Sequence, residues 1–156
     1  TIATMVSFKY LKTRDVAGQT KWLAVPQITD RAMFKLLPAG DMNPAYQNGL
    51  MRLGAARIRT VAATRQIQRP DADQARDDDR ELYADFVVQD WEGILDDEGN
   101  EVPFSRENAK EFFALLPAWI FDRIRIFCMM PENFLQPSAL AIKEKVGNSV
   151  SGSSGS

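Results

Sequence analysis

An acidic stretch near the middle of the chain holds the side chains whose types and spacing could best do chemistry. The segment WEGILDDEGNEVPF, residues 91–104, places Asp96, Asp97, Glu98 and Glu101 within a few positions of one another. Paired carboxylates act as general acid and base when their surroundings push their pKa values apart. These four carboxylates surround a Gly-Asn pair, which indicates a solvated loop that offers no such contrast. The pattern therefore does not favour catalysis.

The same acids also raise the question of a metal site. An EF-hand loop places calcium ligands at its positions 1, 3 and 5, ahead of a glycine at position 6. If Gly99 is that glycine, Ile94 occupies the first ligand position, so the EF-hand pattern is excluded. A looser divalent site that uses Asp96, Glu98 and Asn100 remains compatible with the spacing.

A hairpin turn is the interpretation that the sequence favours for this stretch. Gly99 and Asn100 tolerate positive φ, and the segments on either side contain the apolar residues that such a turn would bring together. We expect a short hairpin near residues 92–104, with Pro103 limiting its length. The side chains expected on its core side are Trp91, Ile94, Val102 and Phe104.

The residue types that are missing exclude several classes of protein. The chain of 156 residues contains no histidine and one cysteine, Cys128, within the apolar run IRIFCMM. Ser/His/Asp and Cys/His catalytic sites, histidine or cysteine zinc sites and an internal disulfide are therefore excluded. We expect a buried Cys128, no enzymatic activity and no cofactor, since no Gly-rich phosphate loop is present either.

Charge and hydropathy give no sign of a nucleic-acid or membrane partner. The formal net charge is −2, and no apolar stretch approaches the roughly 20 residues that a membrane span requires. The first ten residues lack the pattern of a signal peptide. The sequence therefore predicts a soluble protein of the cytoplasm.

The amino-terminal part of the chain predicts a small β element followed by a helix. Residues 5–11 alternate apolar and polar side chains, and residues 21–28 are apolar and β-branched, so both are predicted as strands. Residues 28–40 are predicted as a short helix, with Asp30 as its N-cap and Pro-Ala-Gly as its stop.

Two long helices are predicted next. The first occupies residues 41–70, with Asn43 as N-cap, Pro44 at the first helical position and Pro70 at its end. Gly49 and Gly54 weaken this helix, which indicates a close contact with a neighbouring helix. The second is predicted over residues 71–91, because Asp71 and Asp73 make its first turn acidic and Leu82 and Phe86 form an apolar stripe at helical spacing.

The carboxy-terminal part predicts three more helices. Ser105 is a good N-cap for residues 106–116, Pro117 separates that helix from an apolar helix over residues 118–130, and a short helix follows over residues 138–146. The fold class is therefore α+β and mostly helical, with five or six helices, a two-stranded amino-terminal element and the hairpin near 92–104. We expect one domain, residues 1–146, and a flexible Ser/Gly tail, residues 147–156.

The order of motifs in the central part resembles a known group of viral proteins. NPAYQNGLMR is followed by DRELYADFVVQDWEGILDDEGNEVPFSRENAKEFFALLPAWIFDRI and then by PENFL. This order is similar to the tail assembly chaperones and related small tail-morphogenesis proteins of long-tailed bacteriophages and prophages. The resemblance extends over residues 43–135, and its central feature is a helix that leads into W-x-G-I, an acidic turn and V-P-F.

The resemblance implies a non-enzymatic phage tail assembly factor. Such a protein binds the tape-measure protein and the tail-tube protein, keeps them soluble and forms homo-oligomers. No set of functional residues transfers from that family position by position. The alternative is a structural component of the virion, such as a tail or head-tail connector subunit, in which case the protein would be located in the virion.

One apolar run supports binding to another protein. The segment AWIFDRIRIFCMM is apolar around most of its helical circumference, so it must be either the central core helix or a helix covered by another chain. Asp122, Arg123 and Arg125 mark its polar side. The candidate partner-binding residues in this run are Trp119, Ile120, Phe121, Ile124, Phe127, Met129 and Met130.

The long helix also contains a set of arginines that invites a nucleic-acid interpretation. These are Arg52, Arg57, Arg59, Arg65 and Arg69. Phosphate binding needs cations on one face, but helical rotation spreads this set around the axis. Because acidic residues follow at once, we expect solvated ion pairs and no nucleic-acid partner.

Overall fold

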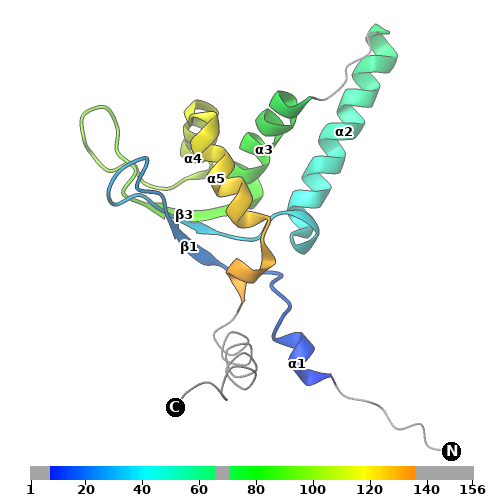
Figure 1. Cartoon of the computed structure of the whole chain (residues 1–156). Coiled ribbons are helices and arrows are strands. Elements are labelled where there is room, and N and C mark those ends of the chain that lie inside the picture. Colours follow the sequence, from blue (N-terminus) through cyan, green and yellow to red (C-terminus); the bar gives the residue numbers. More distant parts are fainter. Residues whose placement is uncertain (1–7, 66–70, 136–156) are drawn as a thin grey trace, which may run out of the picture.

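A computed structural model describes residues 8–65 and 71–135 (Figure 1). A small antiparallel sheet lies under a layer of helices, and one long helix extends to the side (Figure 1). This confirms the predicted α+β, mostly helical class. The elements are α1 (Lys9–Lys12), β1 (Lys21–Ala24), β2 (Met33–Leu36), the 3-10 helix η1 (Gly40–Met42), α2 (Pro44–Thr64), α3 (Ala72–Phe86), β3 (Val88–Glu92), α4 (Arg106–Leu115), α5 (Ala118–Cys128) and the 3-10 helix η2 (Pro131–Phe134).

The sheet has the order β1-β2-β3, and β2 is its central strand. Phe34 pairs with Leu23 on one side and with Trp91 on the other. Phe34 and Leu36 are fully buried, whereas Met33 and Lys35 are half-buried, which is the alternation of a strand with one core face. The predicted helix over residues 28–40 is therefore wrong, and Asp30 lies in the connection between β1 and β2.

The predicted strand over residues 5–11 is also wrong in its described part, because Lys9–Lys12 form α1. Residues 5–7 lie outside the described residues. No side chain of α1 is buried, so the core does not dictate its conformation. The amino-terminal β element is made by β1, as predicted, and by β2, which replaces residues 5–11 as the partner strand.

Helix α2 begins as predicted. The Asn43 side chain accepts a hydrogen bond from the Tyr46 amide, and Pro44 occupies the first helical position. The helix ends at Thr64, where Arg65 adopts a left-handed φ of 55°. Pro70, the predicted end, lies outside the described residues. Only Tyr46 and Gly49 are buried, because the carboxy-terminal part of α2 extends beyond the other helices (Figure 1).

Gly49 makes the close helix contact that the sequence predicted. A Cβ atom at Gly49 would lie 2.6 Å from Leu82 Cδ2 and 2.7 Å from Phe86 Cε2, both on α3. A Cβ atom at Gly54 would meet nothing within 4 Å. The prediction is confirmed for Gly49 only, because α2 has moved away from α3 by the second glycine.

This difference predicts opposite effects for two identical substitutions. Gly49→Ala should destabilise the protein by about 1–2 kcal/mol, since the methyl group forces Leu82 and Phe86 to move. Gly54→Ala should stabilise it by about 0.5–1 kcal/mol, because alanine favours the helix and has room there. Urea unfolding of both variants would measure this. Equal shifts of both midpoints would contradict the packing difference.

The predicted helix over residues 71–91 divides into α3 and β3. Asp71 caps α3 by accepting a hydrogen bond from the Gln74 amide, and Asp73 lies in the first turn. The chain leaves the helix after Phe86, and Val88 pairs with Leu36 of β2. Helical periodicity alone did not reveal this change, because the strand forms against a partner far away in the sequence.

The hairpin near 92–104 is confirmed. Leu95 and Glu101 form an antiparallel bridge, and Gly99 has a φ of 83°. The Trp91 indole nitrogen donates to the Val102 carbonyl at 2.8 Å, which joins the two sides of the hairpin. Trp91 and Ile94 are buried, and Val102 and Phe104 pack against the core, as expected.

The last two α-helices follow the sequence signals closely. The Ser105 side chain accepts from the Asn108 amide and caps α4, and Pro117 separates α4 from α5. Arg80 of α3 donates hydrogen bonds to the backbone carbonyls of Phe113 and Leu116. It thereby supplies hydrogen-bond donors to carbonyl groups at the carboxy-terminal end of α4. The helix predicted over residues 138–146 lies outside the described residues.

A chain of aromatic rings joins the sheet to the helices. Phe34 of β2 contacts Phe113 of α4, Phe113 contacts Phe121 of α5, and Phe121 contacts Tyr83 of α3, with ring centroids 5.3–5.9 Å apart. Tyr83 in turn contacts Tyr46 of α2. Each such pair adds about 0.5–1.5 kcal/mol beyond its buried area. The core thus fixes α5 against both the sheet and α3.

Candidate functional site

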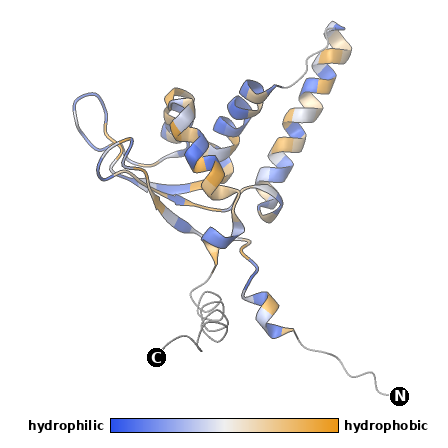
Figure 2. Ribbon diagram, viewed as in Figure 1, coloured by the Kyte–Doolittle hydropathy of each residue, from blue (hydrophilic) through white to orange (hydrophobic). Residues whose placement is uncertain are grey.

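Helix α5 has one buried side and one exposed apolar side. Ile120, Phe121, Ile124 and Cys128 point into the core and are at most 5% exposed. Trp119, Ile126, Met129 and Met130 are between 47% and 63% exposed. Rotation by 100° per residue places Trp119, Arg123, Ile126 and Met130 on one line, with Met129 beside it. These five residues are called the α5 face, and Figure 2 shows that hydrophobic residues continue to the carboxy-terminal end of the helix.

The structure separates the candidate partner-binding residues into two groups. One group belongs to the core and cannot contact a partner directly: Ile120, Phe121 and Ile124. Trp119, Met129 and Met130 are exposed, and Phe127 is half-buried against Phe134 at 5.4 Å between ring centroids. The candidate set omitted Ile126, which is 63% exposed. Its position seven residues after Trp119 was the signal that could have placed it on the same side.

The α5 face borders a wide groove. This groove has a volume of about 800 Å³ and lies between α2, α3 and α5. Its apolar walls include Leu50 of α2, Ile126 of α5, and Met129 and Met130, which directly follow α5. A smaller hollow of about 320 Å³ lies between α5 and the end of β1, and Ile126 and Met130 border it as well. These two side chains therefore stand between two hollows.

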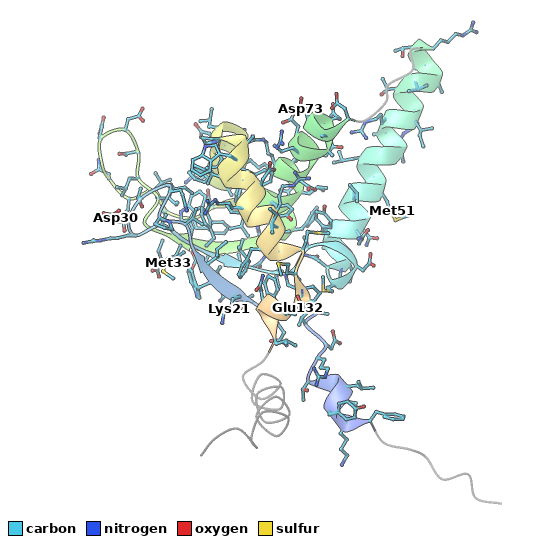
Figure 3. All side chains as sticks on the ribbon, in the orientation of Figure 1. Lys21, Asp30, Met33, Met51, Asp73 and Glu132 are labelled. Atoms are coloured by element: carbon cyan, nitrogen blue, oxygen red, sulfur yellow. The ribbon has the colours of Figure 1, made fainter. Side chains whose placement is uncertain are left out.

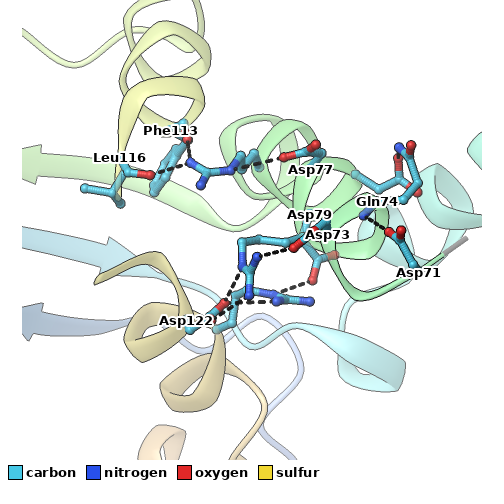
Figure 4. A network of polar contacts seen from close by, with 12 residues as sticks. Asp71, Asp73, Gln74, Asp77, Asp79, Phe113, Leu116 and Asp122 are labelled. Carbon is cyan, nitrogen blue, oxygen red and sulfur yellow. Dashed lines mark hydrogen bonds and ion pairs between the residues drawn. The ribbon is translucent and has the colours of Figure 1, made fainter. Parts of the chain in front are cut away.

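A network of charged side chains lines the α3 side of the groove. Asp79 of α3 accepts hydrogen bonds from the Tyr46 hydroxyl at 2.6 Å and from Arg125 Nε at 2.8 Å. Asp122 of α5 accepts from Arg76 and Arg125, both at 3.1 Å. Figure 4 shows Asp79 and Asp122 facing each other across these arginine contacts. The network joins α2, α3 and α5 at the groove.

The pKa shifts follow from these contacts. The hydrogen bond from Arg76 lowers the pKa of the Asp122 carboxyl, although partial burial opposes this. Burial raises the pKa of the Tyr46 hydroxyl, and the hydrogen bond to Asp79 adds to the shift. Burial alone raises the pKa of the Cys128 thiol, which fits a cysteine that packs in the core. At neutral pH Asp122 is therefore ionised beside Arg76 and Arg125, and the Tyr46 hydroxyl keeps the proton that it donates to Asp79.

The sequence model of the YdaY prophage protein family matches residues 41–145, about two thirds of the chain. The chain belongs to the YdaY prophage protein family. Comparisons with curated proteins and with solved structures found no match. The family match begins at η1 and includes α2, α3, β3, α4 and α5, so it contains both walls of the groove and leaves out β1 and β2. The expected phage or prophage origin is thereby confirmed.

The acidic hairpin of this YdaY family member serves its own turn. One carboxylate oxygen of Asp96 accepts the backbone amides of Glu98 and Asn100, both at 2.9 Å. Asp97, Glu98 and Glu101 are exposed. Within residues 8–65 and 71–135, no group of three or more Cys, Asp or Glu side chains is arranged to hold a metal ion. The two hydrogen bonds to Asp96 support the turn interpretation of this stretch.

The predicted ion pairs of the arginines between residues 52 and 69 form only in part. Arg57 pairs with Asp78 of α3 at 2.5 Å, and Arg52 lies over the Phe86 ring with 6.0 Å to its centroid. In the described part of the chain, Arg59 and Arg65 form no ion pair. Arg69 lies outside the described residues. No described helix is both long and apolar enough to cross a membrane.

Proposed function

We propose that this YdaY family member is a non-enzymatic phage tail assembly factor. It binds an amphipathic helical segment of the tape-measure protein or the tail-tube protein against the α5 face. The observation that carries the proposal is the exposure of Ile126, Met129 and Met130, at 63%, 54% and 47%, beside a groove of about 800 Å³.

The chemistry of the groove favours an apolar helix over a small charged ligand. Asp79, Asp122 and Arg125 already form hydrogen bonds with one another or with neighbouring side chains. A charged ligand could bind these side chains only by breaking the hydrogen bonds that they already form. The apolar walls are therefore the part of the groove that is available to a ligand. A helix has a diameter of about 10 Å with its side chains, and it is the usual occupant of an apolar groove of this kind.

The two exposed methionines favour a partner helix whose side chains vary along its length. Methionine is unbranched and adapts its shape to irregular partners. Met129 and Met130 stand next to each other at the end of α5, so they can adjust to different side chains of a client helix. The tail proteins enter the proposal through the resemblance of residues 43–135 to tail assembly chaperones, and the prophage family supports that direction.

The proposal is tested by co-expression of the full chain with the tape-measure and tail-tube proteins of the same prophage. We expect a complex with at least one of them, and Ile126→Glu should weaken it roughly thirtyfold, since a central apolar contact is worth about 2 kcal/mol. Ile58→Glu is the matched control, because Ile58 is 71% exposed and does not line the groove, so this change should leave client binding unchanged.

Two results would contradict the proposal: no complex with either tail protein, or equal binding by the Ile126→Glu variant and the original chain. Purified phage particles provide a separate measurement. Stoichiometric amounts of the chain in mature particles would favour the alternative function, a structural subunit of the tail or the head-tail connector.

A further inference from the structure

Helix α2 presents an apolar stripe that nothing in the described part of the chain covers. Met51, Ala55, Ile58 and Ala62 follow one another at spacings of four, three and four, and all four are exposed. This spacing places them on one line of the helix, as in the seam of a helix pair. Met51 and Ile58 are 70% and 71% exposed, and Figure 3 shows Met51 on the outer side of α2.

The length of α2 adds to this observation. Only Tyr46 and Gly49, both near its start, are buried. Helices in water gain most of their stability from packing of an apolar face, and short isolated helices are marginal. Figure 2 shows apolar positions continuing along α2 beyond its contact with α3. An additional packing partner for this part of the helix is therefore expected.

The charges beside the stripe restrict what that partner is. Helix α2 contains three arginines and no acidic residue. Arg52 and Arg59 both lie along one edge of the stripe. Pairing of two α2 helices through this stripe would bring like charges together. The charge pattern favours a partner surface that combines an apolar centre with carboxylates.

The chain itself has such a surface on its other side. A hollow of about 270 Å³ lies between the acidic hairpin and α4, and Ile94, Val102 and Phe112 are among the apolar residues that line it. Leu95 and Leu115 also line it and are 45% and 78% exposed. Its charged lining residues are Asp96, Asp97 and Glu111, and no lysine or arginine lines it.

Two of these carboxylates are available to a partner. Among residues 8–65 and 71–135, Asp97 and Glu111 have no ion pair, whereas Asp96 binds its own turn. In the view of Figure 1, the hairpin and α2 lie at opposite sides of the molecule. A chain therefore cannot place its own α2 stripe in its own hollow.

We propose that the α2 stripe of one copy docks in the hairpin-α4 hollow of a second copy. Met51 and Ile58 would cover Leu95 and Leu115, and Arg52 and Arg59 would face Asp97 and Glu111. Because two different surfaces meet, the contact is heterologous, and each dimer keeps one free stripe and one free hollow. Such contacts form rings when the rotation closes and filaments when it does not. The α5 face takes no part, so this inference is independent of the proposed function.

The mass of the full chain in solution tests the proposal, measured by analytical ultracentrifugation over a range of concentrations. We expect oligomers for the original chain, and monomers for Ile58→Glu and for Leu115→Glu measured separately, with Kd values at least roughly tenfold higher. Both side chains are largely exposed, so circular dichroism should show an unchanged fold. High salt should also weaken the oligomer, since the charge pairs are exposed.

Mixing the two variants decides whether the contact is heterologous. Ile58→Glu keeps an intact hollow and Leu115→Glu keeps an intact stripe, so an equal mixture should form a dimer with one copy of each. A monomeric original chain, oligomers that survive either substitution, or a mixture that stays monomeric would each overturn the proposal. Should a glutamate variant fail to fold, Arg59→Glu and Glu111→Lys provide the same comparison. Ile126→Glu should still oligomerise, which separates this result from the test of client binding.

Discussion

Replacement of Gly93 by alanine is expected to destabilise the protein by about 3–5 kcal/mol, a large part of the stability of a small domain. Gly93 follows β3 and has a φ of 71°, which costs a residue with a side chain about 1–2 kcal/mol. Its new Cβ atom would also lie 2.3 Å from the Arg31 carbonyl oxygen. That oxygen belongs to the backbone, so it cannot move aside as the end of a side chain would.

The position of Gly93 explains why both effects occur together. The end of β3 passes directly over the connection between β1 and β2, where the Thr29 hydroxyl donates to the Gly93 carbonyl at 2.7 Å. A side chain at this point would separate the two segments and remove that hydrogen bond. The fold alone therefore explains why the W-x-G-I motif has a glycine at position 93, without any role in ligand binding.

Gly99→Ala is the matched control. Gly99 has a similar φ of 83°, but a Cβ atom there would meet nothing within 4 Å. We expect a cost of only about 1–2 kcal/mol from the backbone conformation. Thermal and urea unfolding of both variants would measure the difference. If the two variants lose equal stability, the close approach of Gly93 to Arg31 contributes nothing.

Replacement of Asp79 by alanine is the second large effect. Asp79 is 8% exposed and accepts hydrogen bonds from Tyr46 and Arg125. Its removal leaves a buried hydroxyl and a largely buried guanidinium without their main acceptor. Breaking a buried charge pair in this way costs about 3–5 kcal/mol, and the remaining bond from Arg125 to Asp122 should hold the loss to about 2–4 kcal/mol.

The first residue of the same Asp-Asp-Asp run, Asp77, provides the control. The Asp77 side chain is 69% exposed and lies 3.5 Å from Arg80, so Asp77→Ala should cost less than about 0.5 kcal/mol. Equilibrium unfolding of Asp79→Ala, Tyr46→Phe and the double variant would give the coupling between the two side chains. A coupling near zero would show that the hydrogen bond between Tyr46 and Asp79 does not stabilise the fold.

The Asp79 contacts also connect stability to the candidate site. Tyr46 belongs to α2 and Arg125 to α5, the two walls of the groove. Asp79 on α3 thus connects the two walls through its hydrogen bonds with Tyr46 and Arg125. A variant that remains folded without Asp79 should bind a client helix less tightly, because its groove walls are no longer held in place.

The sequence by itself determined the features that depend on near neighbours in the chain. Asn43, Asp71 and Ser105 cap their helices because each side chain reaches an amide three residues later. The turn around Gly99 and the break at Pro117 likewise follow from the conformations that glycine and proline favour. These signals were sufficient for the starts of three helices and for the turn of the hairpin.

The tertiary structure alone decided where strands replace helices and which apolar side chains are exposed. Residues 33–36 and 88–92 form strands because they pair with each other, and neither segment contains that information by itself. Likewise, the apolar sequence of α5 does not state which side meets the sheet and α3. Packing buried Phe121 and Ile124 and left Ile126 and Met130 outside, so the candidate binding surface exists only in the folded chain.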